Sequence, residues 1–298
     1  PIQAQRGEIY DRHYDYPLVV NMDSFAVDII PAELNEESLE RVAEGLAEIL
    51  PLTAAEITER IPEEYRSFHQ PLEIMGGVDY ATIAHIAERI EDFPGVTWHS
   101  KPIRQYLDVG SLSHVIGHVG NITSEELQVL YNEGYGINAV IGKSGVEKRY
   151  DDILRGENGK RFYTADVHGK TMEGEVTEEV PPENGKNLVL TIDTEIQKLA
   201  EKALGERMGS AIVLKPATGE ILAMVSYPWY DPNLFNRRDS KEWFRELSLD
   251  SNHPFLNRAI QSSYAPASTF KVVMTTAALE EEAISPDRTI LCEGSLRV

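Results

Sequence analysis

The sequence predicts an α+β protein of more than one domain. Its 298 residues exceed the usual size of one domain and suggest two or three. Segments with helical spacing of apolar residues alternate with short β-branched runs, so both helices and strands are expected. A polar stretch rich in Gly, Pro and Glu, residues 168–187, is the expected boundary between a first domain, 1–185, and a second, 186–298.

Composition excludes several classes of function. The chain has 28 basic and 49 acidic residues, a formal net charge of −21, which repels nucleic acid and anionic membrane surfaces. Its one cysteine, Cys292, rules out an intrachain disulfide and a cysteine-rich zinc site. No apolar run approaches the ~20 residues that cross a bilayer. Because the chain begins at Pro1, we expect an export signal or anchor to be absent from this piece.

The first domain shows both kinds of element. Residues 18–30 are rich in β-branched and apolar residues and are expected to form strands. Residues 37–50 carry an apolar helical face, made of Leu39, Val42, Ala43, Leu46 and Leu50. Residues 80–91 repeat that pattern, with apolar residues at Ile83, Ile86, Ala87 and Ile90. The sequence "FPGV" at 93–96 is expected to end this helix.

The second domain is expected to begin with a strand that leads into a helix. Asp193 is the predicted N-cap of this helix. Its predicted apolar stripe consists of Ile196, Leu199, Ala200, Ala203 and Leu204. Residues 210–226 then predict a β-hairpin with Pro216 and Gly219 in the turn.

A serine and a lysine lie three residues apart near the C-terminal end of the sequence. The segment "FKVVMTTAAL", 270–279, is apolar on nearly every side, so we expect a buried helix that carries Lys271 beside Ser268. Burial lowers the pKa of a lysine, and a neutral amine can take the proton of a serine hydroxyl. The pair therefore predicts acyl-enzyme chemistry, although a bare S-x-x-K also occurs by chance.

Six motifs in one order give that pair a context. "RGEIYDR" (6–12), "PGVTWHSKPIRQY" with "SHVIGHVG", and "GKSGVEKRYDDILRGENG" (142–159) are followed by "PATGEILAMVSYPWYDPN", "NRAIQSS" and "YAPASTFK" (264–271). Together they resemble the class B penicillin-binding proteins, most closely the elongation-type peptidoglycan D,D-transpeptidases. The resemblance covers nearly the whole chain.

The resemblance implies a fold and an architecture. It implies an elongated pedestal of the dimerisation type over 1–185, with an inserted head subdomain at roughly 35–100. The N-terminal part of a serine transpeptidase domain of the penicillin-binding and β-lactamase-like class would follow over 186–298. The parent protein would be anchored in the bacterial inner membrane by an N-terminal helix absent here, with its domains on the periplasmic side.

The resemblance also implies an activity and partners. Ser268 would attack the D-Ala-D-Ala carbonyl of a peptidoglycan stem peptide, with Lys271 as proton acceptor, and β-lactams would acylate the same serine. The reaction would cross-link the wall during lateral elongation. A SEDS-type membrane glycosyltransferase and cell-shape scaffold proteins are the implied partners of the pedestal. No cofactor, no metal and no nucleic acid are implied.

The sequence departs from the family pattern in two ways. The family usually has glycine before the serine, and this chain has Ala267, which would be strained if the position requires a positive φ. The S-x-N and K-[ST]-G boxes do not follow Lys271, so the chain is expected to be a truncated fragment that does not cross-link alone. The "KSG" at 143–145 lies upstream of the serine, and the P-loop-like glycines around it are better explained by turns and helix caps.

Two other functional classes remain open. A non-catalytic pedestal module could bind and activate a membrane glycan polymerase. A β-lactam sensor or β-lactamase could share the S-T-F-K box, although a simple hydrolase would not carry a pedestal. His114 and His118 are expected to form structural hydrogen bonds rather than bind metal. Arg6, Asp11 and Arg12 are expected to form a salt-bridge cluster.

Overall fold

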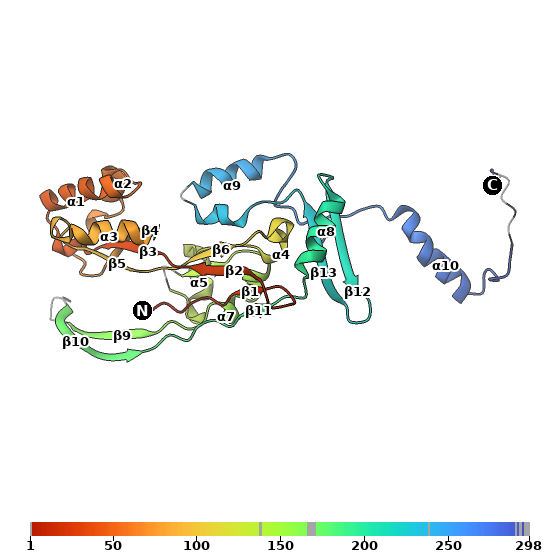
Figure 1. Cartoon of the computed structure of the whole chain (residues 1–298), viewed down its shortest axis with the longest axis horizontal. Coiled ribbons are helices and arrows are strands. Elements are labelled where there is room, and N and C mark those ends of the chain that lie inside the picture. The colour runs from red at the N-terminus through yellow and green to blue at the C-terminus, as the bar shows by residue number, and fades with distance from the viewer. Residues whose placement is uncertain are drawn as a thin grey trace. The chain divides into compact units, whose positions relative to one another are not determined.

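The computed structural model describes residues 2–136, 139–165, 171–237, 239–289, 291 and 294, so Cys292 lies outside the described residues. The chain divides into two compact units, Pro1–Ala259 and Ile260–Val298. Helices and strands are mixed throughout the first unit, as an α+β fold requires (Figure 1).

Residues 25–100, here called the head subdomain, form a three-stranded antiparallel sheet packed against helices (Figure 1). The elements of this subdomain are β3 (Phe25–Ile29), β4 (Leu72–Val78), β5 (Val96–Ser100), α1 (Glu36–Ile49), α2 (Ala54–Glu59) and α3 (Tyr80–Glu88). The central strand of the sheet is β3, which forms antiparallel pairs with both β4 and β5. Val27 and Ile29 of the central strand are fully buried against Leu46 of α1 and Ile86 of α3, so the strand presents alternate residues to this core.

Local sequence explains where these helices begin. Asn35 accepts a hydrogen bond from the backbone of Ser38, whose hydroxyl accepts one in return, so α1 starts with a capping box. Thr53 and Glu56 form the same box at α2, and Asp79 caps α3. The expected helix at 37–50 and the strands at 18–30 are therefore confirmed.

The helix expected at 80–91 ends earlier than predicted. It stops at Glu88 and is followed by a 3-10 turn, Ile90–Asp92. Ile90 is 40% exposed and Ala87 is also exposed, while Phe93 fills the core position instead. The prediction for Ile90 was wrong because the helix ends before Ile90 can reach the buried face.

A four-stranded sheet in the order β11-β1-β2-β6 forms the centre of the first unit. Its strands are β1 (Ile9–Tyr10), β2 (Pro17–Met22), β6 (Ile103–Tyr106) and β11 (Leu188–Val189). The pairing of β1 with β11 is parallel, whereas β1–β2 and β2–β6 are antiparallel. Ile9, Val19, Ile116 and Leu154 are fully buried in the core that this sheet helps to form.

Short elements surround this sheet. They are η4 (Gly110–Leu112), α4 (Ser113–Ile116), β7 (Val119–Asn121), α5 (Ser124–Leu130), β8 (Val140–Gly142), α6 (Gly145–Arg149) and α7 (Asp151–Leu154). The polar segment 168–187, which was expected to be a domain boundary, contains strand β10 (Thr171–Val180). This strand pairs with β9 (Lys160–Ala165) to form a β-hairpin. The domain boundary itself stays a prediction.

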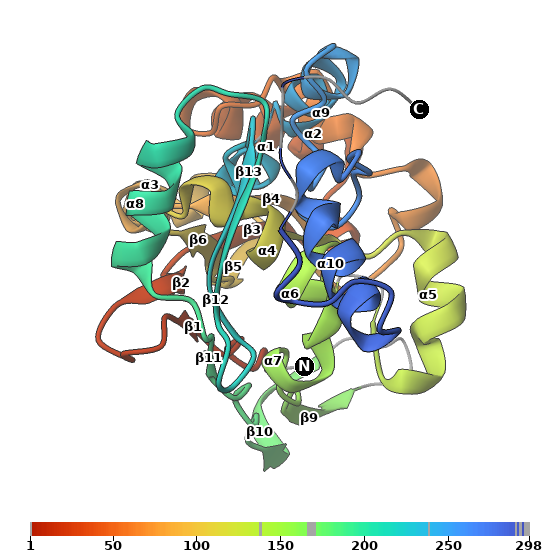
Figure 2. The same ribbon diagram turned by 90° about the vertical axis from the view of Figure 1, so that its right-hand side faces the viewer.

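The hairpin and helix predicted for the second domain are present. They are α8 (Thr194–Leu204), β12 (Gly209–Lys215) and β13 (Glu220–Tyr227), with η6 (Pro232–Asn236) and α9 (Ser240–Leu249) after them. Asp193 caps α8 by accepting hydrogen bonds from two backbone N–H groups. The helix lies along the hairpin in both views (Figures 1 and 2).

The apolar stripe predicted for α8 is not a buried face. Leu199 is 66% exposed, and the buried residue of this helix is Gln197. The Gln197 amide accepts a hydrogen bond from Met224 N at 2.8 Å and donates one to Met224 O at 3.0 Å. A pair of hydrogen bonds to a strand backbone therefore helps to fix α8 on the hairpin.

The second unit contains η7 (Ala267–Phe270) and α10 (Lys271–Glu280). The helix predicted at 270–279 is present, but the prediction that it is buried was wrong. None of its residues is buried, and Val272 is 72% exposed. No other helix or strand is found in the described part of this unit, so nothing within it covers the apolar side chains.

Candidate active site

Ser268 and Lys271 lie on one turn at the junction of η7 and α10. The Thr269 N–H donates to Pro266 O at 3.0 Å, which closes the first turn. The Lys271 N–H donates to the carbonyl oxygens of Ser268 and Thr269. Pro266 therefore opens the helical segment, as the sequence predicts, and the two side chains lie three residues apart on it.

The residue before the serine has a left-handed backbone. Ala267 has φ = 44°, in the region where a Cβ atom approaches the carbonyl oxygen and glycine is favoured. The family's usual glycine would adopt this conformation without strain. The position therefore does have the positive φ at which an alanine is strained.

The described residues do not assemble a complete nucleophilic site around Ser268. Both Ser268 and Lys271 are exposed. Neither side chain has a hydrogen-bond or ion-pair partner in the described part of the chain. The burial that was expected to make Lys271 a base is not found here, because α10 is uncovered.

A buried charge cluster joins two of the sequence motifs. Arg6, from the first motif, and Arg104 of β6 both bind the carboxylate of Glu147, which belongs to the 142–159 motif and is fully buried. Arg6 also pairs with Asp151 at 2.7 Å. Two arginines and two carboxylates thus balance each other in the interior.

Burial and the charges of the cluster shift the pKa values of Arg6 and of two tyrosines beside it. Burial alone would lower the pKa of Arg6, but the Glu147 and Asp151 carboxylates outweigh it and raise that pKa. Burial, followed by the charge of Glu147, raises the pKa of Tyr106. Tyr135 donates its hydroxyl to Asp151 at 2.5 Å, and burial raises the pKa of this tyrosine. The raised pKa values keep Arg6 charged and Tyr106 and Tyr135 neutral near neutral pH, so these three side chains act structurally.

The predicted cluster of Arg6, Asp11 and Arg12 was wrong, because the three side chains have separate partners. Asp11 accepts a hydrogen bond from Thr194 at 2.9 Å, and Arg12 lies 3.5 Å from a Glu220 carboxylate oxygen. Arg6 alone joins the Glu147 cluster.

Two histidines have the structural roles that the sequence predicts. His114 contacts Pro254 O at 2.8 Å through Nε2, and His118 contacts Ser144 Oγ at 3.1 Å through Nδ1. The His118 ring also stacks on Phe235, with centroids 3.7 Å apart. Burial and the Lys143 charge lower the pKa of His118 to about 4. Burial lowers the pKa of His114 too.

The glycines that resemble a P-loop serve the backbone. A Cβ atom on Gly142 would lie 2.0 Å from the carbonyl oxygen of Glu147. Gly142 N also donates to Asp151 at 2.8 Å. Close packing of β8 on α6 therefore explains this glycine, while residues 137 and 138 of the same stretch lie outside the described residues.

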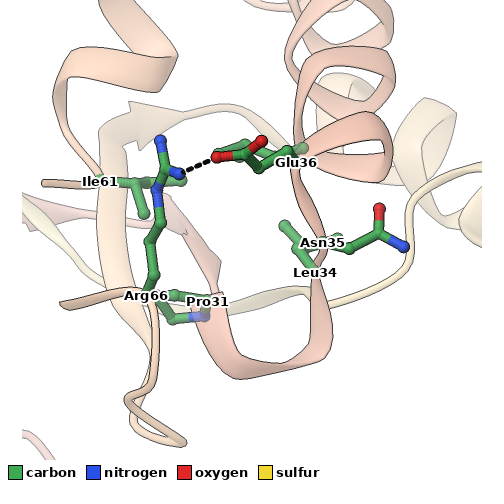
Figure 3. Close-up of a pocket in the computed structure, with 7 residues that line it drawn as sticks. Pro31, Leu34, Asn35, Glu36, Ile61 and Arg66 are labelled. Carbon is green, nitrogen blue, oxygen red and sulfur yellow. Dashed lines mark hydrogen bonds and ion pairs between the residues drawn. The ribbon is translucent and has the colours of Figure 1, made fainter. Parts of the chain in front are cut away.

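One pocket lies in the head subdomain, between the start of α1 and the turn that precedes β4 (Figure 3). Its volume is about 260 Å³. The residues lining it are Pro31, Leu34, Asn35, Glu36, Leu39, Ile61 and Arg66. Arg66 and Glu36 form an ion pair at 2.9 Å across it. The pocket belongs to the first unit and contains neither Ser268 nor Lys271.

Sequence reasoning missed one group of potential metal ligands. Asp28, Glu73 and His99 lie on three adjacent strands of the head sheet, and their ligand atoms are within 4.8 Å of one another. Residues so far apart in sequence give no spacing motif. Asp28 lies in the segment 18–30 that was predicted to form strands, whereas no strand was predicted at Glu73 or His99.

Among the described residues, no helix combines the length and the apolar character needed to cross a membrane.

Comparison with family descriptions covers nearly the whole chain. Residues 1–190 match the Penicillin-binding Protein dimerisation domain, and residues 209–297 match the Penicillin binding protein transpeptidase domain.

Curated relatives give the same result. The Peptidoglycan D,D-transpeptidase MrdA of Escherichia coli K12 is 32% identical over 99% of this chain and 46% of its own length. Penicillin-binding protein 3 of Bacillus subtilis is 33% identical over 98% of this chain and 42% of its own length. The chain therefore spans a little under half the length of the curated relatives it matches.

Solved structures share the fold. The complex between Penicillin-Binding Protein (PBP2) and MreC from Helicobacter pylori matches with a TM-score of 0.82 at 26% identity, over 97% of this chain and 53% of that one. The Helicobacter pylori PBP2 structure without a named partner matches with a TM-score of 0.73 at 25% identity, over 97% of this chain and 55% of that one.

Proposed function

Because the chain belongs to the penicillin-binding proteins, with a dimerisation domain followed by part of a transpeptidase domain, we propose that it comes from a peptidoglycan D,D-transpeptidase whose nucleophile is Ser268. The observation that carries this proposal is the placement of Ser268 and Lys271 on one turn after a proline, at the start of a helix. The names of its MrdA relatives support the D,D-transpeptidase activity.

The proposed reaction begins with acylation. The Ser268 Oγ bonds to the carbonyl carbon of the penultimate D-Ala of a stem peptide, and the amide bond to the terminal D-Ala breaks. The Lys271 amine takes the hydroxyl proton and passes it to the departing D-Ala nitrogen. An amine of a neighbouring stem peptide then attacks the ester, which releases Ser268 and forms the cross-link. A β-lactam would acylate the same oxygen by ring opening.

The partners and the location are part of the proposal. A Helicobacter pylori PBP2 has been solved with MreC, so a cell-shape scaffold of that kind is the proposed partner of the first domain. A SEDS-type glycosyltransferase is the proposed membrane partner. The parent protein is proposed to act in lateral wall elongation on the periplasmic side of the bacterial inner membrane.

A second candidate function is a non-catalytic module that binds such partners. The exposure of Ser268 and Lys271 favours this for the chain by itself. Uncovered groups have no preorganised donors for an oxyanion and no dry environment for the lysine. Activity of the chain alone is therefore not expected unless other residues cover α10.

The test is intact-mass analysis after incubation with benzylpenicillin. One drug adduct that disappears in Ser268→Ala and in Lys271→Ala, but persists in the neighbouring Ser263→Ala, supports Ser268 as an assembled nucleophile. An adduct that persists in Ser268→Ala overturns that assignment. An unmodified chain that still binds an MreC-type scaffold, equally well as Ser268→Ala, supports the non-catalytic module.

A further inference from the structure

Three potential metal ligands lie together on the head subdomain. They are Asp28 on β3, Glu73 on β4 and His99 on β5, and one ligand atom from each lies within 4.8 Å of the others. His99 Nδ1 is 2.6 Å from Asp28 Oδ2. An imidazole nitrogen and two carboxylates are a ligand set that zinc accepts.

The sheet register holds these groups in place. Asp28 is the direct partner of Glu73, and His99 is the partner of Ala26, two residues along the same strand. Val27 and Ile29 on either side of Asp28 are fully buried in the core, so Asp28 points to the opposite face. Three neighbouring strands therefore present their donors on one face, from backbone that hydrogen bonds make rigid.

The centre of the group is a buried carboxylate. The Asp28 side chain is only 7% exposed, and its Oδ1 atom has no hydrogen-bond donor in the described part of the chain. A carboxylate that is buried to this extent is stabilised by an additional positive charge.

A lysine supplies positive charge at the edge of the group. Lys101 Nζ lies 2.7 Å from both carboxylate oxygens of Glu73. The Lys101 N–H donates to Ser24 O at 2.8 Å, so this residue continues β5 beside His99. The Lys101 ammonium therefore competes with any cation that would use Glu73.

We propose that Asp28, Glu73 and His99 bind a zinc ion in competition with Lys101. Three protein ligands leave a fourth tetrahedral position for water. The imidazole and the small number of oxygens favour zinc over magnesium or calcium, which prefer six or more oxygens. The ion would join the three strands of the head sheet, far in sequence from Ser268, so the proposal does not depend on the transpeptidase assignment.

The test measures zinc binding to the whole chain by titration calorimetry, with cobalt absorption as a second readout of the ligand set. Wild type is expected to bind one zinc ion, and His99→Gln to weaken binding at least ~10-fold. Because His99 is partly exposed, this variant should fold. Lys101→Met is expected to tighten binding by roughly three- to tenfold, because a competing ion pair is lost.

His85→Gln is the matched control. His85 is an exposed histidine on α3 of the same subdomain, so its loss should leave the affinity unchanged. Weaker binding in Asp28→Asn, with the cobalt spectrum lost, would support the site further. Absence of one-to-one binding at micromolar zinc, or equal affinity in wild type and His99→Gln, overturns the proposal.

Discussion

Arg6 donates its Nε group to Oε2 of Glu147 at 2.7 Å and its Nη2 group to the Glu147 carbonyl oxygen at 3.0 Å, and Nη2 lies within ion-pair distance of the same Oε2 atom, also at 2.7 Å. The two residues are 141 positions apart. This contact joins the N-terminal segment of the chain to α6 through the Glu147 carboxylate, which is fully buried. The geometry explains why the sequence has an arginine and a glutamate in these two motifs.

Removal of the Glu147 charge should destabilise the first unit strongly. In Glu147→Gln, Arg104 loses the one carboxylate that pairs with it among the described residues, and Arg6 keeps Asp151 alone of its two, so buried positive charge is left uncompensated. We expect the free energy of unfolding to fall by about 3 kcal/mol or more, measured by urea denaturation. The control is Glu36→Gln, which removes an exposed carboxylate paired with Arg66. An equal loss in both variants would contradict the structural role of the cluster.

His118 should make the protein less stable as the pH falls. Its folded-state pKa of about 4 lies below the unfolded value of 6.5, so the unfolded chain binds more protons between these limits. Stability is complete above pH 6.5 and is lost as the pH falls towards 4. We expect a loss of roughly 2 to 3 kcal/mol from this group, after allowance for the partial exposure of the ring.

The variant His118→Phe keeps a ring to stack on Phe235 and removes the titration. Its free energy of unfolding should therefore fall less steeply than that of wild type between pH 6.5 and 4. His114 and the carboxylates are common to both proteins. Parallel pH profiles would show that His118 does not titrate as described.

Glycine at position 267 should stabilise the turn before Ser268. Ala267 has φ = 44°, and relief of this strain in Ala267→Gly is worth roughly 1 kcal/mol. The measurement is amide hydrogen exchange in α10, which should slow. In Ala278→Gly, within the same helix, exchange should become faster because glycine weakens a helix interior. Faster exchange in both variants would argue against the strained conformation.

Two leucines that each belong to the apolar stripe of a predicted helix should differ sharply in the unfolding free energy that is lost on truncation to alanine. Leu46 is fully buried in the head core, so Leu46→Ala should cost about 2–5 kcal/mol of unfolding free energy. Leu199 on α8 is 66% exposed, and Leu199→Ala should change that free energy by no more than ~0.5 kcal/mol. Thermal and urea unfolding of the purified chain test both. A large cost at Leu199 would mean that its face is covered in solution.

Local pattern was sufficient where a helix covers a sheet. Leu39, Val42 and Leu46 predict α1 because its partner strands lie within the same subdomain, and Asn35 marks its start. The helices α8 and α10 were also predicted, but the expected burial of α10 was wrong, and Leu199 in the apolar stripe of α8 is exposed. An apolar stripe predicts that one face of a helix packs against other apolar side chains. It does not predict whether those side chains belong to the same 298 residues.

The sequence could not predict which charged groups meet. Arg12 and Arg6 stand six residues apart, yet one lies against Glu220 and the other against Glu147. Strand register decides such pairings, and it depends on long-range contacts rather than local spacing. Asp28 and His99 were missed for the same reason, since they meet only when β3 pairs with β5.

The parallel pairing of β1 with β11 sets a limit on how the molecule can be divided. Leu188 N donates to Glu8 O and Leu190 N donates to Tyr10 O, each at 2.9 Å, so the far side of β1 is closed by residues almost two hundred positions later. A recombinant pedestal cut at residue 185 would leave that backbone edge open to strands of other molecules, and open edges promote aggregation. An expression boundary placed after Leu190 keeps the hydrogen bonds between β1 and β11. These few residues therefore decide whether the first domain can be purified without aggregating.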